Sequence, residues 1–83
     1  MVTPQAISVA IVDDDPSLCR SLARLLKASG FEATTFLSAE TFLERDTRDF
    51  DCLVLDIQLG GMSGLDLGRQ LATDGSKVPV IYL

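Results

Sequence analysis

Four short apolar runs recur along the chain, at residues 7–12, 31–36, 52–55 and 78–83. Runs of this length that are rich in Val, Ile and Leu are typical of strands, and an uninterrupted run indicates a strand buried on both faces. The second run, FEATTF, is partly polar, so we expect it at an edge of the sheet.

Apolar residues at helical spacing separate these runs and predict three helices. The positions are Leu18, Leu22, Leu25 and Leu26 in the first, Ala39, Phe42 and Leu43 in the second, and Leu67, Leu71 and Ala72 in the third. Asp15 and Pro16 form a typical helix start, Gly30 a typical stop, and Ser38 a second helix cap.

Strands that alternate with helices predict an α/β fold with a mostly parallel, doubly wound sheet and right-handed crossovers. We expect the strand order 2-1-3-4. In such a sheet, ligands bind beyond the carboxyl ends of the strands where the winding direction reverses, which is between the first and third strands.

Aspartates stand at this predicted crevice. Asp13 and Asp14 follow the first strand and Asp56 follows the third, and neighbouring strands lie only about 4.8 Å apart. Carboxylates crowded in this way repel one another, which raises their pKa values or recruits a cation, and hard oxygen ligands favour Mg²⁺. With Mg²⁺ bound, one aspartate is free to act as a nucleophile toward a phosphoryl group.

Structural explanations compete with chemical ones at several positions. An aspartate run before a helix also serves as an N-terminal cap, and we assign that role to Asp15. Gly61 and Gly64 are expected to supply positive φ angles in a turn, and no Gly-Lys-Ser/Thr sequence completes a P-loop. We expect the larger apolar side chains to pack in the core or at its margin, namely Phe36, Phe42, Met62 and Tyr82.

Composition narrows the possible functions. The chain has 83 residues, enough for one small domain, and its formal charge of −5 supplies no basic stripe for nucleic acid or an anionic membrane. Residues 1–5 carry no export signal, and no apolar stretch is long enough to span a bilayer, so we expect a cytoplasmic protein. Cys19 and Cys52 lack a metal or redox spacing and are expected in the core.

Three stretches resemble the receiver domain of two-component response regulators: IVDDDPSLCRSL, CLVLD and DIQLGGMSGLDL. The resemblance covers essentially the whole chain and implies a flavodoxin-like fold. A fourth stretch, FLSAETFL, resembles the FixJ and NarL-type transcriptional regulators.

The resemblance implies a role for each acidic residue. Asp56 accepts phosphate from the phosphohistidine of a sensor kinase or phosphotransfer protein, and Asp13 and Asp14 form the acidic pocket. Asp14, Asp56 and the backbone carbonyl of Gln58 bind Mg²⁺, and Asp13 binds it through water. The implied activity is a signalling switch that only phosphorylates and dephosphorylates itself, controlling an output domain, transcriptional in type, absent from this chain.

Two departures from the family pattern stand out. The family usually has proline where this chain has Gly60, which predicts a more mobile loop after Asp56. The family also continues past the position of Leu83 with a Ser or Thr hydroxyl, a lysine on a fifth strand, and flanking helices. Residues 1–83 are therefore expected to hold the N-terminal portion of the domain, with the last strand as an apolar edge that favours self-association or a homodimer.

Two other functions are consistent with parts of the pattern. A haloacid-dehalogenase-like phosphatase also uses an aspartate at a strand end, but it needs a second carboxylate where this chain has Gln58. A receiver-like protein-interaction module that is never phosphorylated is the other alternative, although all three acidic positions are intact.

Overall fold

The structure is a computed structural model, and it describes residues 6–83. The expectation about an export signal concerns residues 1–5 and lies outside the described residues. The strands are β1 (Ser8–Val12), β2 (Glu32–Phe36), β3 (Cys52–Leu55) and β4 (Val80–Tyr82); the helices are α1 (Pro16–Ala28), α2 (Ala39–Leu43) and α3 (Gly64–Thr73). A short 3-10 helix at Thr47–Asp49 precedes β3.

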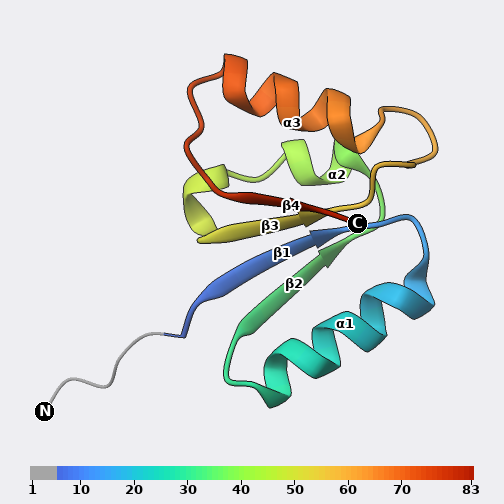
Figure 1. Ribbon diagram of the computed structural model, residues 1–83, viewed down its shortest axis with the longest axis vertical. Helices are drawn as coiled ribbons and strands as arrows, with labels where there is room; N and C mark the ends of the chain where they lie inside the picture. Colours follow the sequence, from blue (N-terminus) through green and yellow to red (C-terminus); the bar gives the residue numbers. More distant parts are fainter. Residues whose placement is uncertain (1–5) are drawn as a thin grey trace, which may run out of the picture.

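All four strands are parallel and lie in the order β2-β1-β3-β4, which confirms the predicted topology. Helix α1 covers one face of the sheet, and α2 and α3 cover the other (Figure 1). In register, Val12 of β1 lies beside Phe36 of β2 and Leu55 of β3. The carboxyl ends of the three strands therefore reach the same edge of the sheet.

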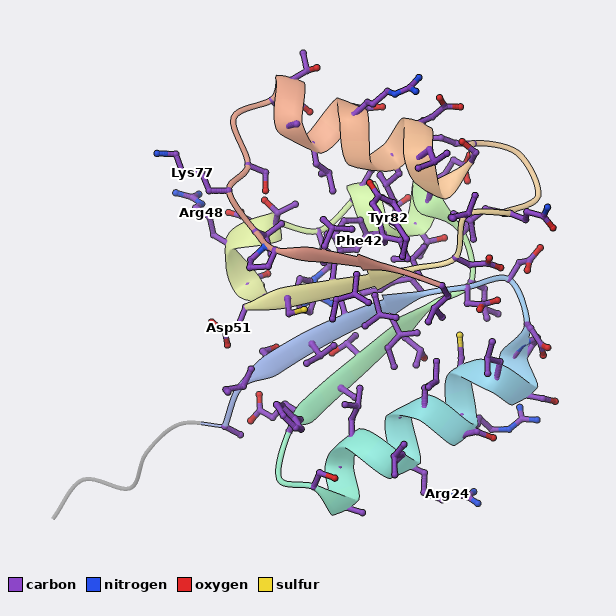
Figure 2. All side chains as sticks on the ribbon, in the orientation of Figure 1. Arg24, Phe42, Arg48, Asp51, Lys77 and Tyr82 are labelled. Carbon is purple, nitrogen blue, oxygen red and sulfur yellow. The ribbon has the colours of Figure 1, made fainter. Side chains whose placement is uncertain are left out.

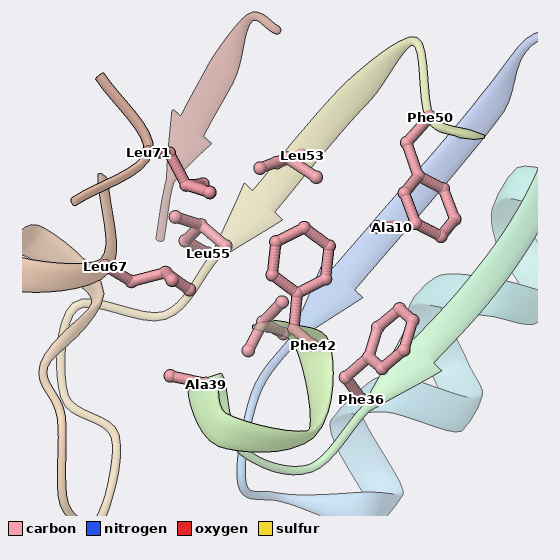
Figure 3. Packing of buried hydrophobic residues seen from close by; sticks show 10 residues of the cluster. Ala10, Phe36, Ala39, Phe42, Phe50, Leu53, Leu55, Leu67 and Leu71 are labelled. Atoms are coloured by element: carbon pink, nitrogen blue, oxygen red, sulfur yellow. The ribbon is translucent and has the colours of Figure 1, made fainter. Parts of the chain in front are cut away.

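The larger hydrophobic cluster fills the space between the sheet and helices α2 and α3 (Figure 3). Phe42 is fully buried in it and meets the ring of Phe36 edge-on, with 5.2 Å between ring centroids. The ring of Phe50 packs against both of these rings, with 5.9 Å between ring centroids in each pair. Ala10, Leu53 and Leu55 supply the sheet side of this cluster. The cluster therefore packs against β1 and β3, the two central strands whose carboxyl ends carry the predicted site.

The apolar face of α1 agrees with the prediction only in part. Leu18 and Leu25 are exposed, whereas Cys19 and Ala23 are buried against β1 and Leu22 and Leu26 pack beside them. Positions 19, 22, 23 and 26 follow the i, i+3, i+4, i+7 spacing of one helix face, and residues 18 and 25 lie beside that stripe. Cys19 and Ala23 are the buried members of this stripe, and Leu22 and Leu26 are only partly buried.

Three strands are shorter than predicted. The strands begin at Ser8, Glu32 and Val80 rather than at residues 7, 31 and 78. Strand β4 begins after Pro79, which has no N–H to donate to the sheet. The Pro79 carbonyl still accepts from the Leu53 amide at 2.9 Å. The 3-10 helix was not predicted, and it begins where the Asp46 side chain accepts from the Arg48 amide at 2.9 Å.

Within residues 6–83, β4 pairs with β3 alone, and Ile81, Tyr82 and Leu83 are exposed. Self-association through this edge stays a prediction. Tyr82 extends from β4 toward α3 (Figure 2), where its hydroxyl lies closest to Gly68. Tyr82 belongs to neither hydrophobic cluster, so the structure does not bear out its predicted packing in the core. Among residues 6–83, none of the helices combines the length and the apolar character of a membrane span.

Candidate functional site

The site is assembled by the backbone at the ends of β1 and β3. The Asp13 amide donates to the Phe36 carbonyl of β2 at 3.0 Å, and the Asp56 amide donates to the Val12 carbonyl of β1 at 2.9 Å. These bonds continue the sheet ladder by one residue beyond the strands. As a result, both aspartates leave the sheet at the same level, on neighbouring strands.

The structure brings together the three aspartates that the sequence singled out. One carboxylate oxygen from each of Asp13, Asp14 and Asp56 can be chosen such that all three lie within 4.8 Å of one another. Asp15 behaves as expected of a cap, because its side chain accepts from the amides of Ser17 at 2.9 Å and Leu18 at 3.3 Å. The aspartate run is thus divided between a cluster and a helix cap.

The three carboxylates differ in their exposure to water. Asp13 is 2% exposed, Asp56 is half-buried and Asp14 is exposed. Burial raises the pKa of Asp13, and the charges of Asp56 and Asp14 raise it further, while a hydrogen bond from the Asp15 amide opposes the shift. No lysine or arginine within residues 6–83 forms an ion pair with any of the three. The cluster is therefore a concentration of uncompensated negative charge.

Backbone amides hold two of these carboxylates in fixed orientations. The Asp15 amide donates to Oδ1 of Asp13 at 2.9 Å, and the Gln58 amide donates to Oδ1 of Asp56 at 3.1 Å. Each bond links an aspartate side chain to the backbone amide two residues later. The path of the backbone after each strand therefore also fixes the orientation of the aspartate side chain that follows the strand. Close carboxylate oxygens without a protein cation are the donor set that suits a hard divalent ion such as Mg²⁺.

The loop that follows Asp56 packs over the cluster and onto α2. A methyl group on Gly60 would lie 3.7 Å from Oδ2 of Asp14, and Gly61 has a φ of +112° next to Glu40. The positive φ predicted for Gly61 is confirmed. The prediction for Gly64 is wrong, because its φ is not positive. Gly64 is instead required by a close approach of α3 to the backbone of Asp56.

Sequence reasoning also missed the role of Cys19 beside the site. Its buried thiol donates to the Asp13 carbonyl at 3.2 Å, and burial raises the pKa of the thiol. The side chain therefore supports the turn that carries Asp13 and Asp14. The expectation that Cys52 is a core residue holds only in part, since Cys52 is half-buried at the edge of the α1 cluster.

Comparisons with known proteins agree with this architecture. A family model described as the response regulator receiver domain matches residues 9–83. The transcriptional regulatory protein FixJ of Azorhizobium caulinodans is 37% identical over 81 residues, which cover 96% of this chain and 38% of FixJ. The chain thus spans well under half the length of this curated relative.

Two solved structures are similar over most of the chain. The response regulator StyR superposes with a TM-score of 0.87 and 40% identity, covering 94% of this chain and 40% of that one. The BeF₃-activated receiver domain of DrrB superposes with a TM-score of 0.81 and 28% identity, covering 94% of this chain and 65% of that one.

Proposed function

Because the chain belongs to the response regulator receiver domain family, we propose that it is a phosphorylation-controlled switch whose phosphoryl acceptor is Asp56. The observation that carries this proposal is the convergence of Asp13, Asp14 and Asp56 within 4.8 Å at adjoining strand ends. Asp56 suits the role of nucleophile, since it is half-buried and its Oδ1 atom is already fixed by the Gln58 amide.

The proposed reaction transfers a phosphoryl group from a phosphohistidine of a sensor histidine kinase or phosphotransfer protein. A carboxylate oxygen of Asp56 forms a bond to phosphorus, the phosphorus–nitrogen bond breaks, and the imidazole keeps the electron pair and takes up a proton. Hydrolysis reverses the modification when water attacks phosphorus and the phosphorus–oxygen bond to Asp56 breaks. Each cycle restores the aspartate and releases inorganic phosphate, so the modification is reversible and the chain acts as a switch.

The acidic cluster fits a Mg²⁺ cofactor. Asp14 and Asp56 are the proposed direct ligands, with the Gln58 backbone carbonyl as a third and Asp13 acting through water. Bound Mg²⁺ would neutralise the carboxylates and the incoming phosphoryl oxygens. Asp13 contributes a buried negative charge with a raised pKa, a charge that a nearby cation would stabilise.

The proposed output is control of transcription through a further domain. Support comes from FixJ, a transcriptional regulatory protein of which this chain covers only 38%. A phosphatase of the haloacid-dehalogenase type is disfavoured because Gln58 occupies the position where a second carboxylate would be needed.

Binding of a phosphoryl analogue tests the proposal. We expect the protein with Mg²⁺ and beryllofluoride to show saturable one-to-one binding, read by fluorine-19 NMR. Asp56→Asn should abolish it, since the amide offers no anionic oxygen to the beryllium. Asp74→Asn, a change at the exposed C-terminal cap of α3, is the matched control and should bind normally.

Two results would contradict the proposal. One is the absence of saturable binding by the unmodified protein in the presence of Mg²⁺, which would favour an interaction module that is never phosphorylated. The other is equal binding by the Asp56→Asn variant, which would place the acceptor at another residue.

A further inference from the structure

Helix α3 begins unusually close to the backbone of Asp56. Gly64, the first residue of this helix, is buried, and a methyl group at that position would overlap the Asp56 carbonyl oxygen. The same methyl group would stand 2.8 Å from the Asp56 carbonyl carbon and 3.1 Å from Cα of Ile57. All of these atoms belong to the backbone, so no side-chain rotation can relieve the overlap.

Hydrogen bonds fix both partners of this contact. The Gly64 amide donates to the Ile57 carbonyl at 3.0 Å, and Ser63 caps α3 by accepting from the Asp66 amide at 3.1 Å. On the opposite side, the Asp56 amide is bound to the Val12 carbonyl of β1 at 2.9 Å. The segment from Asp56 to Gln58 is therefore held between the central strand and the start of α3.

We infer that Gly64 is a positioning residue for the phosphoryl acceptor, because its missing side chain lets α3 fix the backbone from Asp56 to Gln58 in the geometry that Mg²⁺ requires. The inference rests on the proposed function. Mg²⁺ needs oxygen ligands at about 2.0–2.1 Å in near-octahedral arrangement. A shift of this segment would move two proposed ligands together, the Asp56 carboxylate and the Gln58 carbonyl. In catalytic sites a misplacement of about 1 Å can lower the reaction rate roughly 100-fold, and a metal that needs near-ideal octahedral geometry is sensitive to position in the same way.

Gly68, one turn further along α3, supplies a matched control. The three atoms that lie nearest to a methyl group at Gly68 all belong to the side chain of Tyr82, at its hydroxyl and ring edge. Tyr82 is 41% exposed and extends from β4 toward α3 (Figure 2), so its ring can turn toward solvent. Gly64→Ala and Gly68→Ala therefore add the same atom to the same helix, one against the acceptor backbone and one against a partly exposed side chain.

The test measures the dissociation constant of Mg²⁺ by NMR titration of the intact protein and its two variants. NMR follows the resonances of folded molecules, so a loss of stability alone does not change the constant. We expect Gly64→Ala to weaken Mg²⁺ binding at least fivefold and Gly68→Ala to stay within twofold of the unmodified protein. A smaller effect of Gly64→Ala, or an equal effect of Gly68→Ala, would overturn the inference.

A second variant decides the matter if Gly64→Ala does not fold. Ser63→Ala removes the cap of α3 without adding an atom near Asp56, so it loosens the same contact. It should weaken Mg²⁺ binding at least twofold, and a smaller change would overturn the inference. Failure of the unmodified protein to bind Mg²⁺ would instead contradict the proposed function, and this inference with it.

Discussion

Asp13 is the residue whose environment conflicts most with its charge. It is buried beside two other carboxylates, and its pKa is raised first by burial and then by Asp56 and Asp14. Asp13→Asn would keep an oxygen for the Asp15 amide and remove the buried charge. We expect the free energy of unfolding at pH 7, measured by urea denaturation, to increase by about 0.5–2 kcal/mol.

The pH dependence of this gain follows from the direction of the shift. The folded protein holds the Asp13 proton more tightly than the unfolded chain does. The free-energy cost of the buried Asp13 charge is therefore present in full above the pKa of the folded protein. It declines as the pH falls through that pKa and is gone below the ordinary value of 3.8. The advantage of Asp13→Asn should shrink over the same range. If the difference in free energy of unfolding between Asp13→Asn and the unmodified protein did not depend on pH, this account would be contradicted.

At the scale of elements, the loop from β3 to α3 combines two glycines with opposite requirements. Gly60 lies outside the positive-φ region, and a methyl group there would make an ordinary contact 3.7 Å from Oδ2 of Asp14. Gly60→Ala should therefore raise the free energy of unfolding by about 0.4–1 kcal/mol, because it restricts the unfolded chain. Thermal denaturation measures the change.

Gly61→Ala is the matched control for this loop. The φ of +112° at Gly61 is one that alanine rarely adopts, so the substitution should destabilise the protein. Equal effects of the two substitutions would show that the loop adjusts freely and that backbone conformation does not decide its stability.

The elements also show what the sequence could and could not predict. The sheet and the acidic cluster were predictable because β1 and β3 are apolar runs that end directly at aspartates, and parallel strands bring such ends together. The buried face of α1 was predicted only in part. Cys19, Leu22 and Leu26 were expected there, but Leu18 and Leu25 could not be told apart from the other leucines, and the small Ala23 gave no signal. The role of Gly64 depends on a contact between α3 and Asp56, and a single sequence carries no sign of such tertiary proximity.

At the scale of the whole molecule, the proposed cation site would couple Mg²⁺ binding to folding. Mg²⁺ that binds the folded protein and not the unfolded chain stabilises it by RT ln(1 + [Mg²⁺]/Kd), which is about 1.4 kcal/mol at ten times Kd. For a domain of this size, 1 kcal/mol corresponds to about 4–8 °C in the melting temperature. We therefore expect the melting temperature to rise by several degrees with Mg²⁺, as measured by circular dichroism.

The comparison must separate specific binding from screening, since the protein has a formal charge of −5 and general repulsion also weakens with salt. NaCl at matched ionic strength is the reference, and it should give a smaller rise than Mg²⁺. Asp14→Asn should remove the difference, because Asp14 lies within the cluster and is exposed, so the change disturbs little packing. If NaCl matched Mg²⁺, or if Asp14→Asn kept the full response, the three aspartates would repel one another without forming a cation site, and the proposed phosphoryl transfer would lose its physical basis.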